Sequence, residues 1–157
     1  MKYTNTQGLD DIVTNLGTEQ RNEATKEIAD VSTEKMLEMI NAEDSKVPAI
    51  VAKVIPQIAK AVELIAERIE LGGRLIYVGA GTSARLAFMD AAECPPTYNI
   101  RPGTITCVMA GGRERVFSAN ERLEDREENA VNDLKDIKLK AEDTVVAAAA
   151  SGRTPYC

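Results

Sequence analysis

The chain reads IYVGAGTSARL at residues 76–86, and this stretch decides the fold. An apolar run of strand type enters a turn of glycines and hydroxyl residues, and a helical pattern follows the turn. Glycine lets the backbone approach a ligand closely, while the free amides and the dipole at a helix start attract an anion. We therefore predict that Gly81, Thr82 and Ser83 bind a phosphate group. The alternative is a tight turn that needs glycine for its geometry and binds nothing.

The glycine spacing also fits nucleotide-binding motifs, which the following sequence argues against. Gly79, Gly81 and Ala84 match the dinucleotide fingerprint, but an NAD site needs an acidic residue about 20 positions further on. The second predicted strand ends instead in AGG at residues 110–112. No Gly-Lys-Ser/Thr sequence follows the first glycines, so a P-loop is excluded.

A second apolar run, TVVAAAA at residues 144–150, leads into the polar sequence SGRTPY. In an open parallel sheet, ligands collect at the carboxyl ends of the strands, so two such turns can converge on one site. We expect Ser151, Gly152 and Thr154 to bind the same phosphate. Arg153 can add a charge-assisted contact to a phosphate or sugar oxygen, or it can be a solvated surface arginine.

Strand and helix patterns alternate through the second half of the chain. Strands are predicted at 74–78, 104–109 and 144–149, and helices at about 85–93 and within 115–136. Right-handed βαβ crossovers then make a three-layer α/β/α sandwich with a parallel sheet, buried on both faces. Because the chain stops at Cys157, where the second turn would begin its helix, we expect this sheet to be truncated after its third strand.

The N-terminal part shows an irregular arm and two helical patterns. Residues 1–30 are polar and weakly periodic, after which Ser32 or Thr33 can cap a short helix through Ala42. A long helical pattern at 46–71 contains Pro56, which predicts a kink or break near Val54. Its apolar residues occupy more than one face, as suits a helix between its own sheet and a second subunit.

Composition limits the classes of function. A chain of 157 residues with a net charge of -6 fits one acidic domain without a nucleic-acid footprint. It has neither a secretory segment nor an apolar run of the roughly 20 residues that span a membrane, so the cytoplasm is expected. Three cysteines without C-x-x-C spacing support neither a zinc site nor a disulfide framework, and histidine is absent. We expect no metal or other cofactor, and proton transfer by carboxylates.

Four motifs in order carry a resemblance to a known family: GAGTSAR at 79–85, DAAECPPTY at 90–98, AGG at 110–112 and AASGRTPY at 149–156. With them, nearly the whole chain resembles the N-acetylmuramic acid 6-phosphate etherases, which have the sugar isomerase (SIS) fold. The resemblance implies an arm and short helix at 1–45 and a partial SIS domain at 46–157, and family members continue for roughly as many residues again. It also implies a phosphosugar site, to which Arg85 belongs as the end of the first motif.

The resemblance implies a lyase of amino-sugar catabolism and cell-wall recycling. Such an enzyme cleaves the D-lactyl ether of N-acetylmuramic acid 6-phosphate to N-acetylglucosamine 6-phosphate and D-lactate. The family's acid corresponds to Glu93, and its second catalytic glutamate, the base, corresponds to Glu124. Residues 120–123 depart from the family's compact sequence before this base.

Spacing along the chain adds a constraint on the subunits. Ten helical residues from Ser83 to Glu93 span about 15 Å, which exceeds a hexose phosphate. SIS proteins commonly form dimers with shared sites, so we expect a homodimer in which a neighbouring subunit supplies Glu93. The open alternatives are a phosphosugar isomerase, a noncatalytic sugar-phosphate sensor and an inactive fragment of the etherase.

Overall fold

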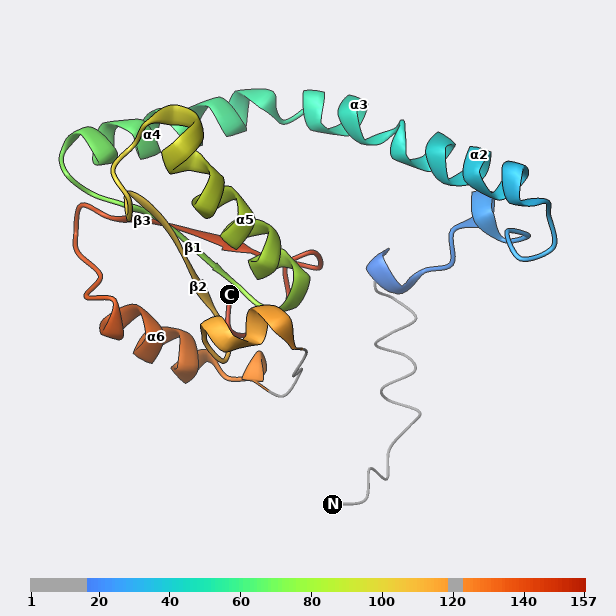
Figure 1. Ribbon diagram of the computed structural model, residues 1–157. Helices are drawn as coiled ribbons and strands as arrows, with labels where there is room; N and C mark the ends of the chain where they lie inside the picture. The colour runs from blue at the N-terminus through green and yellow to red at the C-terminus, as the bar shows by residue number, and fades with distance from the viewer. Residues whose placement is uncertain (1–16, 119–122) are drawn as a thin grey trace, which may run out of the picture. The chain divides into compact units, whose positions relative to one another are not determined.

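The structure is a computed structural model that describes residues 17–118 and 123–157 (Figure 1). The first part of the predicted arm, residues 1–16, lies outside the described residues, as does most of the segment at 120–123 before Glu124. The chain divides into two compact units, one ending at Ala59 and the other running from Lys60 to Cys157. Each unit is described by itself below.

The N-terminal unit is helical. Two 3-10 turns, η1 (Gly17–Glu19) and η2 (Glu23–Thr25), precede α2 (Thr33–Asp44) and α3 (Val47–Ala52). Ser32 caps α2, since its hydroxyl accepts a hydrogen bond from the Lys35 amide at 3.3 Å. The predicted cap is confirmed, and the helix runs two residues past the expected Ala42.

The predicted break before Pro56 is also confirmed. Helix α3 ends at Ala52, and α4 (Ile55–Glu70) begins with Pro56 as its second residue. Proline has no N–H to donate and its ring clashes with the preceding turn, so it is tolerated best in the first turn of a helix. The long apolar pattern is therefore split into two helices.

The C-terminal unit contains a parallel sheet of β1 (Leu75–Gly79), β2 (Ile105–Met109) and β3 (Thr144–Ala148). The strand order is β2-β1-β3, with Gly79 aligned to Met109 on one side and to Ala148 on the other. The apolar runs form strands because β-branched residues pack well on a pleated, buried surface. The predicted α/β class with a parallel sheet is confirmed.

Helices cover both faces of this sheet (Figure 1). On one face α5 (Gly81–Tyr98) places the buried Ala84 against Cys107 and Met109. On the other face α6 (Glu127–Asp136) packs Ala130 into a cluster that includes Ile76 and Tyr156. The three layers of the predicted sandwich are thus present.

The predicted bounds of the first crossover helix, 85–93, were wrong at both ends. Helix α5 begins at Gly81, because Ala80 is extended and the hydroxyl residues of the turn already form the first helical turn. It continues through Pro95 and Pro96 and ends where Asn99 adopts a left-handed conformation with φ +54°. The segment after β2 forms a 3-10 helix, η3 (Arg113–Phe117).

A buried ion pair holds the amino edge of the sheet. The fully buried carboxylate of Asp143 accepts hydrogen bonds from the Arg74 amide at 2.9 Å, from Arg74 Nη2 at 2.6 Å and from the Lys140 amide at 2.9 Å. The Arg74 hydrogen bond is the largest of the causes that lower the pKa of Asp143 to about 2. This pair ties the start of β1 to the turn before β3.

Candidate functional site

The two predicted phosphate-binding turns leave the sheet side by side. They follow β1 and β3, which are parallel neighbours and end together at Gly79 and Ala148. A Cβ atom on Gly79 would lie 3.2 Å from the Ala148 oxygen and 3.2 Å from the Ala84 nitrogen. Glycine is needed here because the two backbones approach so closely.

The first turn forms the amino end of α5. Gly81 has φ +53°, while Thr82 is exposed and Ser83 is half-buried. The N-cap residue is Ala80, whose side chain offers no hydrogen-bond acceptor. The first amides of α5 therefore have no capping side chain and are available to an anion or to water.

The second turn exposes its polar groups at the same edge of the sheet. The Arg153 amide donates to Ser151 Oγ at 3.3 Å, and Gly152 has φ +66°. Ser151, Gly152 and Arg153 are exposed, and Thr154 is half-buried. The Gly152 amide also donates to the Ala149 oxygen at 3.3 Å, and the Thr154 oxygen accepts from the Cys157 amide at 2.9 Å.

A cavity of about 530 Å³ extends from Ser83 across the end of β3. Tyr77 and Asp90 line it, together with the apolar residues 146–150. Ser83 thus lies on a cavity that reaches the residue before Ser151, although Ser151 is not among the lining residues. The structure brings the two turns to one edge, where Ser83 but not Ser151 lines this cavity.

Sequence reasoning did not identify Tyr77 and Asp90 as cavity residues. The Tyr77 hydroxyl donates to Asp90 Oδ2 at 2.8 Å, and burial together with this bond raises the pKa of Tyr77 to about 12. The seven-residue spacing of Ser83 and Asp90 puts both on one face of α5, and this spacing could have indicated Asp90 as a neighbour of Ser83.

The predicted base, Glu124, lies near the carboxyl edge of the sheet. Its backbone oxygen accepts a hydrogen bond from the Tyr156 amide at 3.0 Å. Burial is the largest cause that raises the pKa of the Cys157 thiol, and the charge of Glu124 raises it further. The sulfur of Cys157 lies 3.6 Å from the Ala148 oxygen. Glu124 is therefore a half-buried neighbour of the strand end from which the second turn departs.

The predicted acid, Glu93, is not brought to this edge within one chain. It is exposed on α5, ten residues after Ser83. Because α5 is one continuous helix, about 15 Å of helical rise separates the two residues. The distance expected from the sequence is therefore present in the structure.

Arg85 makes contacts within the protein. Its guanidinium donates to the Val116 oxygen at 2.8 Å, to the Ser118 oxygen at 3.1 Å and to the Arg115 oxygen at 3.2 Å. These carbonyls belong to η3 and the residue that follows it. Arg85 thus holds η3 against α5, and Arg153 is the exposed cation at the predicted phosphate turns.

Within residues 17–118 and 123–157, no group of three or more acidic, cysteine or histidine side chains could hold a metal ion. In the same described part of the chain, no helix is long and apolar enough to cross a membrane.

Comparisons with known proteins relate the chain to an SIS domain and to N-acetylmuramic acid 6-phosphate etherases. A family model described as the glucokinase regulatory protein N-terminal SIS domain matches residues 57–157. An N-acetylmuramic acid 6-phosphate etherase of Bacillus subtilis (strain 168) is 53% identical over 141 residues, which cover 90% of the chain and 46% of that protein. Etherases of Escherichia coli (strain K12 / DH10B) and Shigella boydii serotype 18 are each 52% identical over 139 residues, which cover 88% of the chain and 47% of each protein. The chain therefore spans about half the length of the curated relatives it matches.

Proposed function

The chain belongs to the family described as the glucokinase regulatory protein N-terminal SIS domain, and on that premise we propose that the protein carrying it is a carbon–oxygen lyase. The proposed reaction cleaves the D-lactyl ether of N-acetylmuramic acid 6-phosphate to N-acetylglucosamine 6-phosphate and D-lactate. It would serve amino-sugar catabolism and cell-wall recycling in the cytoplasm. The observation that carries the proposal is the 53% identity over 141 residues with the Bacillus subtilis etherase.

The phosphate of the substrate binds between the two turns at the carboxyl edge of the sheet. The uncapped amides at the start of α5 and the hydroxyls of Thr82 and Ser83 supply donors on one side. Ser151 to Thr154 supply donors on the other side, with Arg153 as the cation. The parallel pairing of β1 with β3 supports this placement, because it makes both turns leave the same edge.

Two carboxylates carry the proposed chemistry. In the ring-opened sugar, the aldehyde acidifies the proton on C2, and Glu124 removes it as general base. The C3–O bond then breaks, and Glu93 protonates the departing lactyl oxygen. Water adds to C3 of the resulting unsaturated aldehyde and restores the sugar. The reaction changes no net oxidation state, so the proposed steps use no redox cofactor.

A homodimer supplies the acid that the single chain does not bring to the phosphate. Glu93 is exposed and about 15 Å of helix from Ser83, so a neighbouring subunit's Glu93 completes each site. The apolar residues of α4 are also exposed, Val62 by 56% and Leu64 by 58%, as expected of a helix that a second subunit covers. In this proposal residues 1–45 form the arm and short helix, and residues 46–157 form the phosphosugar-binding part.

A chimaera tests the proposal directly. This chain would replace the matching N-terminal part of the Bacillus subtilis relative, and D-lactate release from N-acetylmuramic acid 6-phosphate would be measured with D-lactate dehydrogenase. We expect D-lactate release, with Glu93→Gln and Glu124→Gln each lowering kcat by about a hundredfold to ten-thousandfold. Glu127→Gln, an exposed glutamate on α6, is the matched control and should leave kcat unchanged.

Other outcomes would replace the proposal with one of its alternatives. A phosphosugar isomerase would interconvert aldose and ketose phosphates without releasing lactate. A sensor would bind the sugar phosphate without turnover, and an inactive fragment would leave the chimaera without either property. Mixing Glu93→Gln with Ser83→Ala subunits tests the shared site, because only an acid supplied across the interface lets the mixed dimer regain activity.

A further inference from the structure

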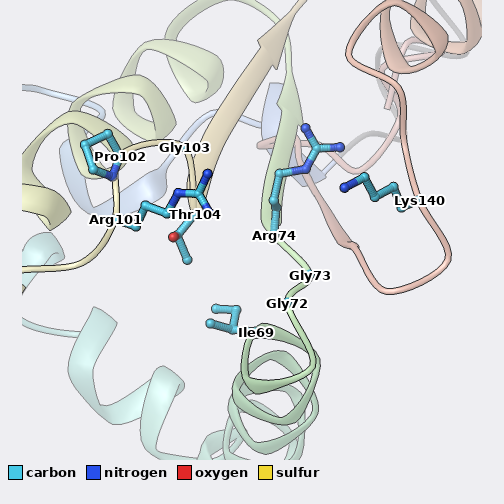
Figure 2. Close-up of a pocket in the computed structure, with 9 residues that line it drawn as sticks. All are labelled: Ile69, Gly72, Gly73, Arg74, Arg101, Pro102, Gly103, Thr104 and Lys140. Carbon is cyan, nitrogen blue, oxygen red and sulfur yellow. The ribbon is translucent and has the colours of Figure 1, made fainter.

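A second cavity lies at the amino edge of the sheet, opposite the turns that carry the proposed function. It has a volume of about 360 Å³ and is formed by the turn after α4, the loop before β2 and Lys140 (Figure 2). The strand from Leu75 to Gly79 rises by roughly 13 Å, so this cavity is remote from the predicted phosphate turns.

The cavity is lined by cations without a lining acid. Arg74, Arg101 and Lys140 contribute its charged side chains, and no Asp or Glu is among the lining residues. In a protein with a net charge of -6, such a concentration of positive charge creates a local field that attracts anions. Figure 2 shows Arg101 and Thr104 on one side of the space and Arg74 and Lys140 on the other.

Two of these cations have no partner in the described part of the chain. The Arg74 guanidinium is engaged by Asp143 and by the Ile137 and Lys138 carbonyls. The side chains of Arg101 and Lys140, by contrast, make no hydrogen bond or ion pair with any described residue. The cavity therefore carries two uncompensated positive charges on a frame that the Arg74–Asp143 pair holds in place.

The frame of the cavity is closely packed. A Cβ atom on Gly73 would lie 2.0 Å from the Glu142 oxygen and 2.8 Å from the Arg68 oxygen. The turn after α4 is thus wedged against the segment that precedes β3. Arg68 Nη1 also donates to the Ala141 oxygen at 2.7 Å, which links the same two segments. A site built on this frame would be largely preformed.

The simpler explanation of the basic residues is that they complement the partial negative charge at helix C-termini. Two helices, α4 and α5, end near this edge before their strands begin. The last carbonyls of α4 are already capped, because the Gly72 and Gly73 amides donate to the Ile69 and Arg68 oxygens at 2.9 Å. Capping leaves less of the charge of α4 for the basic residues of the cavity to neutralise.

We propose that this amino-edge cavity is a second anion site, which binds the phosphate group of a small molecule between Arg101 and Lys140. The exposed backbone of Gly72 and of Gly103 lets the ligand approach the peptide closely. Thr104, which is half-buried, places a hydroxyl on the same cavity. The proposal does not depend on the lyase activity, since it concerns the opposite edge of the sheet.

Amide NMR of the 17.0 kDa chain tests the proposal with inorganic phosphate as the probe. The titration uses the Ser83→Ala/Ser151→Ala variant, which removes two hydroxyl contacts at the carboxyl edge, and the response is followed at the glycine amides of the amino edge. We expect the Gly72, Gly73 and Gly103 amides to shift and to saturate at millimolar phosphate. Removing one charge-assisted contact, by Arg101→Gln or Lys140→Gln, should weaken binding by about tenfold or more.

The same spectra serve for the control variant and show which results would contradict the proposal. Lys60→Gln with Lys135→Gln removes the same total charge away from the cavity and should leave the phosphate affinity within about twofold. Any of three results would overturn the proposal. The signals of the glycine amides do not shift in phosphate, or they shift equally in sodium chloride of matched ionic strength. The third result is a titration that is unchanged in the Arg101→Gln/Lys140→Gln variant. The spectra also report whether each variant is folded, and Arg101→Lys should recover part of the affinity.

A second titrant identifies the source of the phosphate. Tighter binding of glucose 6-phosphate than of inorganic phosphate would support a sugar phosphate as the guest. Equal affinities would support free phosphate. Either result requires the same glycine amides to respond.

Discussion

Replacing Asp143 by asparagine should remove a large part of the stability of the sheet-containing unit. The side chain of Asp143 is fully buried, and it accepts hydrogen bonds from Arg74 and from the Lys140 amide. Asparagine keeps one acceptor oxygen but turns an amide donor toward these donors and leaves the Arg74 guanidinium without its counter-ion. Breaking such a pair costs about 2–4 kcal/mol.

The lowered pKa of Asp143 determines how the same interaction depends on pH. The folded protein lowers it from the model-peptide value of 3.8 to about 2. A change of nearly two units corresponds to about 2 kcal/mol, because each unit is worth about 1.36 kcal/mol. Since the folded pKa is depressed, this stabilisation is present above the unfolded pKa and is lost as the pH falls from about 4 to about 2.

Urea unfolding followed by circular dichroism at several pH values measures both effects. At neutral pH, Asp143→Asn should lower the free energy of unfolding by about 2–4 kcal/mol and the melting temperature by about 5–15 °C. About 1 kcal/mol of the difference between the two proteins should vanish between about pH 5 and about pH 3. Asp136→Asn, an exposed aspartate on α6, is the control and should change stability by less than about 0.5 kcal/mol.

Two results would refute this reasoning. One is a loss smaller than about 0.5 kcal/mol at neutral pH, which is the range of ordinary surface substitutions. The other is a difference between wild type and variant that stays constant as the pH is lowered. The second result would mean that the carboxylate charge does not stabilise the fold.

Three further predictions concern the carboxyl edge and the core. Gly79→Ala should cost about 1–3 kcal/mol in thermal unfolding, because its Cβ meets backbone at 3.2 Å, whereas Gly17→Ala, with open space around it, should be nearly neutral. Tyr156→Phe should cost about 1–2 kcal/mol in urea unfolding, since it deletes a buried 2.6 Å hydrogen bond to a carboxylate on α6; an unchanged midpoint would show that this bond contributes nothing. With a thiol reagent near neutral pH, the exposed Cys157 should react before Cys107, whose pKa burial raises to about 11; labelling in the reverse order would contradict the buried position of Cys107.

Local patterns in the sequence predicted the elements that depend on neighbouring residues. The apolar runs before and after the first turn predicted β1 and a crossover helix, and Ser32 and Pro56 predicted a helix start and a helix break. These features follow from backbone chemistry within a few residues, such as the missing N–H of proline. The same reasoning misplaced the ends of α5, because a glycine and hydroxyl turn can equally be a loop or a first helical turn.

The candidate site could be predicted only in part. The two hydroxyl-rich turns were recognisable because each follows an apolar run. Their convergence depends on β1 and β3 being neighbours, which the strand order decides. The engagement of Arg85 by carbonyls of η3, about 30 residues further on, has no local signal, and neither has the contact of Tyr77 with Asp90.

By itself, the sequence determined the α/β class, the succession of strands and helices along the chain, and the chemical character of the turns, since each depends on residues close together in the chain. Only the tertiary structure decided which turns meet at one edge, which charges remain unpaired at the other, and which carboxylate is buried. Arg74 and Asp143 show the physical reason: 69 residues separate them, and their pairing depends on the sheet bringing the start of β1 beside the start of β3.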